Sequence, residues 1–268
     1  MGINRLETLS KNIRKRIISL ADYCGGDAHW GGALSCTDML AVLYGEYLNT
    51  SNTALPYESR DKFILSKGQS AIALYSTLAE CGLIPEDYLK EFQQDGSILA
   101  ELAIMDDEHH IECSGGSLGL GLPMGVGMAL AAQKKKYTYK TVVMVGDGEC
   151  NEGSIWEAIM LAGQLKLNNL KLIIDLNGLQ SDGATESIID NSNMKDRITQ
   201  FGWDVYEIDG HNLSECLETL RNESSRPQAI VMRTVKGKGI SFMENDNVWH
   251  HYVLEKNWLE DARKEVGL

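Results

Sequence analysis

Asp147 stands between two glycines, where its carboxylate could do chemistry. The Gly-Asp-Gly segment follows an apolar run at Thr141 to Val145, and a helix is expected to begin after residues 152–154. Glycines let a backbone approach a ligand closely, and a helix start offers free amides to an anion. A carboxylate fits beside an anion only if a cation lies between them. The segment therefore predicts a phosphate site that includes a metal.

Asn177 supplies the second part of this pattern. It follows Gly148 after 28 intervening residues and ends the next apolar run of the chain. Oxygens from Asp147, Asn177 and the backbone carbonyl of Leu179, with two phosphate oxygens and water, would form a six-oxygen shell that suits Mg²⁺ or Ca²⁺. The competing interpretation is that Gly-Asp-Gly is only a tight turn and Asn177 only a cap.

Four apolar runs are expected to form the strands that position these residues. The expected strands are Lys62–Ser66, Thr141–Val145, Leu170–Leu176 and Ala229–Val235. Their continuous hydrophobicity is typical of strands buried on both faces, and the stretches between them are long enough for crossover helices. We therefore predict an α/β fold with a doubly wound parallel sheet and helices on both faces. In such sheets ligands bind beyond the carboxyl ends of the strands.

Apolar periodicity predicts helices around this sheet. The expected helices are Leu6–Tyr23, Ser35–Leu48, Ala71–Glu80 and Leu118–Gln133. Ser35 is the N-cap candidate of the second helix, with Asp38 in its first turn. His211, which precedes a further helix start, is expected to be a cap or a surface residue.

The composition is that of an ordinary globular protein. Of the 268 residues, 43% are hydrophobic and 24% charged, and the formal net charge is −13. That charge argues against a nucleic-acid partner, because phosphate-backbone contacts need a basic surface. No apolar run approaches the length of a membrane span, so no membrane association is expected. The six cysteines form no Cys-x-x-Cys pair, which indicates a reducing compartment and a cytoplasmic protein.

Five ordered segments resemble the transketolase family over nearly the whole chain. Gly-Asp-Gly with the later Asn177 resembles the thiamine-diphosphate motif of that family. The other four segments read AHWGGALSCTDMLAVLY (28–44), LSKGQSAIALYSTLAECG (65–82), IECSGGSLGLGLPMGVGMALA (111–131) and RTVKGKGISFMENDNVWHH (233–251). The resemblance implies thiamine diphosphate as the cofactor, with Mg²⁺ or Ca²⁺.

The resemblance also implies roles for single residues. Gly148 would touch the diphosphate, and Asp147, Asn177 and the Leu179 carbonyl would bind the metal. The turn Gly116, Ser117 and Leu118 would lie against the aminopyrimidine. Lys236 and His250 would lie near cofactor and substrate, His29 would contact donor or acceptor oxygens, and Glu152 would be the acidic residue at a dimer contact. Of His250 and His251, we expect His250 to be the functional one.

Two departures from the family pattern affect substrate choice. Gln69 replaces a histidine that the family places beside the diphosphate, so Gln69 is the cofactor-binding candidate there. Glutamine can donate a hydrogen bond but cannot carry a proton or positive charge. Leu102 falls near the position of a second family histidine. Losing both imidazoles indicates a smaller, less sugar-like or carrier-bound substrate.

The resemblance implies that the chain is one part of an enzyme. Residues 1–268 match the diphosphate-binding domain alone, and nothing resembles the pyrimidine-binding domain with its activating glutamate. We therefore expect the N-terminal subunit of a split transketolase-like enzyme, which transfers a two-carbon unit from a ketose or ketoacid donor to an acceptor. A C-terminal transketolase-like subunit would complete it, as an α2β2 assembly. The alternatives are the α subunit of a thiamine-dependent 2-oxo-acid dehydrogenase and a catalytically inactive cofactor-binding subunit.

Overall fold

A central sheet of five parallel strands organises the computed structural model, which describes residues 2–50, 56 and 58–268. The strands lie in the order β2-β3-β4-β8-β7. Their bounds are β2 Lys62–Leu65, β3 Thr141–Gly146, β4 Leu170–Leu176, β8 Gln228–Arg233 and β7 Asp204–Asp209. The register pairs Gly146 with Asp175, so the ends of β3 and β4 meet at the same edge of the sheet.

Both faces of the sheet are buried, as the continuous apolar runs predicted. Val142 and Met144 of β3 belong to one hydrophobic core, while Val143 and Val145 belong to the other. This division follows from the alternation of side chains along a strand. The larger core lies under the N-terminal helices, and the smaller core lies under the helices that directly precede β3, β4 and β7.

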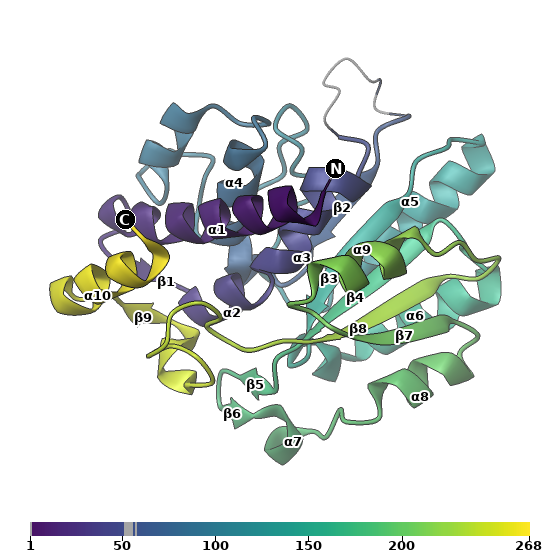
Figure 1. The fold of residues 1–268 in the computed structure, drawn as a ribbon. Helices are drawn as coiled ribbons and strands as arrows, with labels where there is room; N and C mark the ends of the chain where they lie inside the picture. The colour runs from purple at the N-terminus through teal and green to yellow at the C-terminus, as the bar shows by residue number, and fades with distance from the viewer. Residues whose placement is uncertain (1, 51–55, 57) are drawn as a thin grey trace.

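Helices cover the two faces in separate groups (Figure 1). The first group packs around the larger core and comprises α1 Ile3–Ser19, α3 Thr37–Val42, α4 Ala71–Glu80, α9 Leu213–Arg221 and α10 Lys256–Val266. The second group packs on the smaller core and comprises α5 Gly121–Lys135, α6 Gly153–Leu165 and α8 Met194–Gln200. The prediction of a doubly wound parallel sheet with helices on both faces is confirmed.

Short elements bring distant segments together beside the sheet. Strand β1 (Asp27–Ala28) pairs antiparallel with β9 (Tyr252–Val253), which brings the segment at residue 29 next to residues 250–251. The hairpin of β5 (Leu179–Gln180) and β6 (Gly183–Ala184) follows β4 and leads into α7 (Thr185–Ile188). Figure 1 shows this hairpin beyond the sheet edge where β4 ends.

The prediction of one continuous helix over Ser35–Leu48, with Ser35 as its cap, is wrong. The segment instead forms α2 (Trp30–Ser35), then α3, then a π-helical turn at Leu43–Tyr47. Ser35 ends α2 and caps nothing, because its hydroxyl donates to Asp175 Oδ2 at 2.6 Å and lies 3.0 Å from Gly32 O. Asp38 does lie in the first turn of α3, as predicted.

Other predicted elements differ only at their ends, apart from one strand that was not predicted. Helix α5 begins at Gly121 rather than Leu118, because Gly116 and Gly119 adopt positive φ angles of 123° and 83° that keep the preceding turn out of the helix. Strand β7 was missed because its alternating DVYEID sequence has none of the continuous hydrophobicity of the other strands. That pattern fits its position at the edge of the sheet.

The described residues contain no helix with the length and apolar character needed to cross a membrane. The six cysteines are all free thiols.

A glycine on α5 gives a test of the packing between helix and sheet. A Cβ added at Gly125 would lie 2.3 Å from Cγ2 of Val143, whereas one added at Gly127 meets nothing within 4 Å. We expect Gly125→Ala to lower the free energy of unfolding by about 1–3 kcal/mol through overpacking. The matched control Gly127→Ala should be neutral or stabilising, because alanine favours the helix by roughly 0.5–1 kcal/mol. Urea denaturation of both variants measures this, and equal effects would contradict the packing described.

Candidate functional site

A cavity of 360 Å³ opens at the carboxyl ends of β3 and β4, as the fold predicted. Its lining includes nine of the residues that the sequence singled out: His29, Gln69, Leu118, Asp147, Gly148, Asn177, Leu179, Lys236 and His250. It also includes residues that the sequence did not single out, namely Gly32, Lys67, Ser70, Gly146, Glu149, Gln180 and Ser181. Segments far apart in the chain therefore share one cavity.

The Asp147 carboxylate ties the ends of β3 and β4 together. Its Oδ1 accepts from the amide of Gly148 at 2.8 Å, and its Oδ2 accepts from the amide of Gly178 at 2.6 Å. The side chain is almost completely buried. Burial and the nearby Asp175 charge raise the pKa of Asp147 to about 6, although both amide bonds lower it. The site thus holds a buried carboxylate that a cation would stabilise.

The residues of this corner fit a hard divalent cation. Because Gly178 stands between Asn177 and Leu179, its bond to Asp147 places this segment beside the Asp147 carboxylate, and Asp147, Asn177 and Leu179 all line the cavity. Asn177 Oδ1 accepts one bond, from the Leu179 amide at 3.1 Å, and so keeps a lone pair for a metal. A Cβ added at Gly148 would lie 2.7 Å from Cβ of Gln180, so the close approach there requires glycine.

Beneath the cavity lies a buried ion pair. Lys67 Nζ pairs with Asp175 Oδ2 and also donates to Gly32 O at 2.8 Å. Asp175 is fully buried and also accepts from the hydroxyls of Ser35 and Thr234. Burial opposes the charge of Lys67, but the Asp175 charge raises the pKa of Lys67 above its ordinary value. The cavity floor therefore carries a fixed ammonium group.

Lys236 and His250 form a second cationic corner. Lys236 Nζ donates to Leu179 O at 3.2 Å and to Asn247 Oδ1 at 3.0 Å, and lies 2.7 Å from His250 Nδ1. Burial and the Lys236 charge lower the pKa of His250 to about 4, so its ring is neutral near pH 7. Because Nδ1 faces an ammonium donor, it is the acceptor, and Nε2 carries the hydrogen. His250 therefore offers an N–H donor.

Pairing of β1 with β9 places His29 beside His250. Their ring centroids lie 5.6 Å apart, and the His29 and His251 centroids lie 4.3 Å apart. Both His29 and His250 line the cavity, whereas His251 does not. The preference for His250 over His251 thus agrees with the position of the two rings.

Three of the residues to which the resemblance gave roles lie outside this cavity. Gly116 lies next to it, and its carbonyl accepts from Gln69 Nε2 at 3.3 Å. Ser117 lines a small adjacent pocket of 90 Å³. Glu152 is exposed at the N-terminal end of α6, so the described chain gives it no contact with the cavity.

Glu149 is a site residue that the sequence reasoning overlooked. Its Oε1 accepts from the Gly119 amide at 2.9 Å and from Ser66 Oγ, and its Oε2 accepts from the Gly146 amide at 3.1 Å. Glu149 thereby joins the 116–120 turn to the end of β3. Its position directly after Gly-Asp-Gly was the available signal, but its partners lie far away in sequence.

His211 was expected to be a cap or a surface residue, and that expectation is wrong. The cap of α9 is Asn212, which accepts from the Glu215 amide. His211 is largely buried: its Nδ1 lies 2.8 Å from Asp38 Oδ2, and its Nε2 accepts from the Val235 amide at 2.9 Å. His211 therefore anchors the loop that carries Lys236.

Arg14 holds the other end of the same loop. Arg14 donates to Lys238 O at 3.0 Å, and its guanidinium makes a two-point ion pair with Asp38 at 2.9 and 2.7 Å. Asp38 thus pairs with both Arg14 and His211, the two side chains that hydrogen-bond to the backbone of this loop. Burial raises the pKa of Asp38, but hydrogen bonds from His211 and Arg14 outweigh it and hold the pKa well below its ordinary value.

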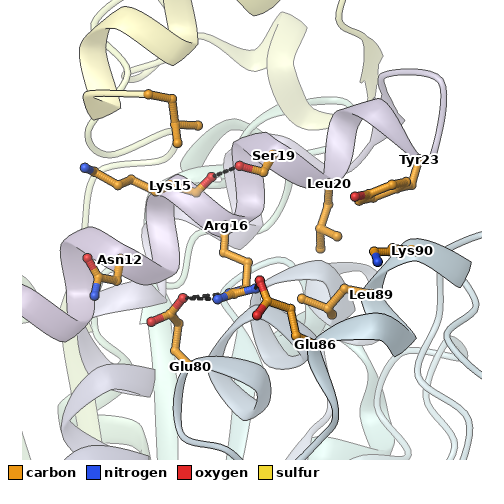
Figure 2. Close-up of a pocket in the computed structure, with 11 residues that line it drawn as sticks. Asn12, Lys15, Arg16, Ser19, Leu20, Tyr23, Glu80, Glu86, Leu89 and Lys90 are labelled. Carbon is orange, nitrogen blue, oxygen red and sulfur yellow. Dashed lines mark hydrogen bonds and ion pairs between the residues drawn. The ribbon is translucent and has the colours of Figure 1, made fainter.

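A second cavity, of 270 Å³, lies between α1 and the segment that follows α4 (Figure 2). Arg16 points between Glu80 and Glu86 there, with ion-pair distances of 2.6 and 3.3 Å. None of the residues singled out by the sequence lines this cavity. The chemistry of the chain is therefore concentrated at the sheet edge.

Comparisons with known proteins agree with this geometry. Residues 13–268 match the family described as "Transketolase, thiamine diphosphate binding domain". An apulose-4-phosphate transketolase subunit from Phocaeicola vulgatus is 40% identical over 270 residues, with 100% of this chain and 95% of that protein covered. The 6-deoxy-6-sulfo-D-fructose transketolase subunit SqwG of a Clostridium species is 37% identical over 244 residues, with 90% and 89% covered.

A solved structure gives the same fold. The transketolase of Campylobacter jejuni superposes with a TM-score of 0.89 at 28% identity, covering 100% of this chain and 43% of that chain. The chain therefore spans less than half of that transketolase, but nearly the whole length of the two subunits.

The Asp38 network predicts a pH-dependent stability. We expect Asp38→Asn to lower the free energy of unfolding at pH 7 by about 3–5 kcal/mol, because it leaves Arg14 without its buried partner. The depressed pKa of Asp38 means that this stabilisation is complete above about pH 4 and is lost as the pH falls further. Urea titrations between pH 7 and pH 2.5 should therefore show the gap between wild type and variant closing in acid.

The control for this experiment is Asp22→Asn. Asp22 pairs with Arg263 at 2.5 Å on the surface, where an ion pair contributes about 0–1 kcal/mol. A gap between wild type and Asp38→Asn that stayed constant down to pH 2.5 would refute the role given to the Asp38 charge.

Proposed function

Because the chain belongs to the transketolase family, we propose that it is the N-terminal, thiamine-diphosphate-binding subunit of a split transketolase. Such an enzyme transfers a two-carbon unit from a ketose or ketoacid donor to an acceptor. The observation that carries the proposal is the Asp147–Gly178 bond, which gathers oxygens from the ends of two adjacent strands in one cavity. The neighbouring ammonium groups of Lys67 and Lys236 line the same cavity and suit a diphosphate.

Asp147, Asn177 and the Leu179 carbonyl would hold Mg²⁺, with Ca²⁺ as the alternative, and Gly148 would lie against the diphosphate. These ligands are oxygens, which hard divalent cations prefer. The cofactor supplies the carbanion chemistry, which the protein positions and activates. The turn of Gly116, Ser117 and Leu118 would support its aminopyrimidine.

His250 and His29 are the proposed contacts to the reacting substrate. With Nδ1 occupied by Lys236, His250 presents its Nε2–H as a hydrogen-bond donor to a substrate oxygen. Lys236 itself has a pKa lowered to about 8 by burial and the Lys67 charge. It is charged at pH 7 and fixes the His250 tautomer. Glu152, exposed at the start of α6, is proposed to lie at an interface between subunits.

A partner chain is expected to complete the active site. The two related subunits match this chain in length, whereas it covers 43% of the Campylobacter jejuni chain. We propose that residues 1–268 form a single diphosphate-binding domain, that a C-terminal transketolase-like subunit carries the pyrimidine-binding domain, and that the assembly is α2β2. The relatives' names favour this proposal over a 2-oxo-acid dehydrogenase subunit or an inactive subunit. Six free thiols support a reducing, cytoplasmic location.

The donor is proposed to be an unusual ketose. Relatives are named for apulose-4-phosphate and for 6-deoxy-6-sulfo-D-fructose. In this chain Gln69 lines the cavity but directs its amide nitrogen to Gly116 O, and Leu102 packs against the same turn. A glutamine and a leucine here offer fewer donors to sugar hydroxyls than two imidazoles would.

Reconstitution tests the split enzyme. We expect the purified chain to lack transketolase activity and to gain it when mixed with a chain that resembles the pyrimidine-binding and C-terminal domains of transketolase.

Asp147→Ala should abolish Mg²⁺-dependent thiamine diphosphate binding in the mixture, as measured by calorimetry. Asp196→Ala, an exposed substitution on α8, is the matched control and should bind normally. Turnover by the chain alone, or unchanged affinity in Asp147→Ala, would rule out the proposal.

Gln69→His tests the substrate inference in the reconstituted enzyme. A restored imidazole can form a hydrogen bond of about 1.5–3 kcal/mol to a substrate oxygen when charge assists it, so kcat/KM for xylulose 5-phosphate should rise roughly tenfold or more. Gln200→His, at the exposed end of α8, controls for an added histidine and should change nothing. High phosphosugar turnover by the wild type would show instead that Gln69 is a neutral replacement.

A further inference from the structure

Four side chains converge on one point beside the cofactor cavity. Asp27 and His29 come from the β1 segment, Glu101 comes from the 97–105 loop, and His251 precedes β9. His29 Nδ1 lies 2.8 Å from Glu101 Oε1. His251 Nε2 lies 3.3 Å from the same oxygen and 3.2 Å from Asp27 Oδ1. The three ligand atoms of His29, Glu101 and His251 all lie within 4.8 Å of one another.

Hydrogen bonding does not account for this convergence. Asp27 Oδ1, His29 Nδ1 and Glu101 Oε1 are all shielded from solvent, and none has a hydrogen-bond partner among the described residues. His29 and Glu101 instead make an ion-pair contact at 2.8 Å. Buried polar atoms normally make hydrogen bonds, whereas these three make only ion-pair contacts within the cluster, so their convergence on one place points to a missing ligand.

From this geometry we propose that Asp27, His29, Glu101 and His251 form a binding site for a divalent transition metal of the zinc class. In a tetrahedral site with metal–ligand distances of about 2.0–2.2 Å, neighbouring ligand atoms are roughly 3.3–3.6 Å apart. The observed separations of 2.8, 3.2 and 3.3 Å need only small side-chain shifts to reach this spacing.

The types of ligand agree with this assignment. Two carboxylates and two imidazole nitrogens are ligand types that a zinc-class divalent ion binds. Imidazole nitrogens favour zinc-class ions, whereas the Asp147 corner offers only oxygens and suits Mg²⁺. The two sites therefore differ in the metal they select.

A bound ion would fasten three separate segments at one side of the cavity. It would hold His29, which lines the cavity, to the 97–105 loop and to the segment before β9. His29 would bind the ion through Nδ1, which leaves its Nε2 for a substrate oxygen. Binding of this ion would need only the chain itself and does not depend on the reaction proposed above.

Calorimetry with ZnCl₂ tests the site, using the full chain in excess Mg²⁺ to occupy the oxygen site. We expect one Zn²⁺ per chain at micromolar or tighter affinity, and a loss of at least tenfold in Glu101→Gln and in His251→Gln. His109→Gln is the matched control, because His109 pairs with Asp106 at 2.6 Å in a cluster with no further ligand among the described residues. That variant should bind Zn²⁺ like the wild type.

Co²⁺ spectroscopy supplies a second measurement on the same proteins. Visible bands of a four-coordinate cobalt ion without a thiolate charge-transfer band are expected, and these bands should be absent in Glu101→Gln. Zn²⁺ should also raise the melting temperature of the wild type but not of the two site variants. Binding that survives both substitutions, a thiolate band, or no binding at micromolar Zn²⁺ would overturn the proposal.

Discussion

The cavity depends on a single buried ion pair, Lys67 with Asp175. Asp175 is fully buried at the end of β4 and also accepts from Ser35 of α2 and from Thr234 after β8. A buried charge is costly unless paired and hydrogen-bonded, and removing one partner costs about 3–5 kcal/mol. The segments that carry Ser35, Lys67 and Thr234 are therefore held in place around Asp175, and they form one side of the cavity.

A second network of the same kind holds the loop that carries Lys236. Asp38 binds Arg14 and His211, which in turn hold the backbone at Lys238 and Val235. Lys236, between these two anchors, is thereby fixed against His250. Both networks offset the cost of buried charge with hydrogen bonds that cross between distant segments, which gives the site a defined shape before any ligand binds.

Local patterns were sufficient to predict four of the five strands of the sheet and the edge at which the cavity lies. Continuous apolar runs identified β3 and β4, and the glycines beside Asp147 identified the sheet edge. Long-range partners were not predictable in this way. Ser35 has the chemistry of a cap, but Asp175, 140 positions along the chain, takes its hydroxyl. His211 similarly finds Asp38 173 positions away. Nothing in the sequence around Ser35 distinguishes it from a helix cap. Nothing in the sequence around His211 distinguishes it from a surface histidine.

The net charge of the chain disfavours a large anionic partner, whereas the ammonium groups in its cavity favour a small anion. A formal charge of −13 argues against an extended polyanion as partner, since a nucleic acid would meet the whole acidic surface. A diphosphate is small enough to meet only the cavity, where the ammonium groups of Lys67 and Lys236 are fixed in place. Charges beyond about 8–10 Å are largely screened at physiological ionic strength, whereas buried charges are screened much less. Affinity for a small anion would therefore be set by these few buried groups and by the cation proposed at Asp147, even in a strongly acidic protein.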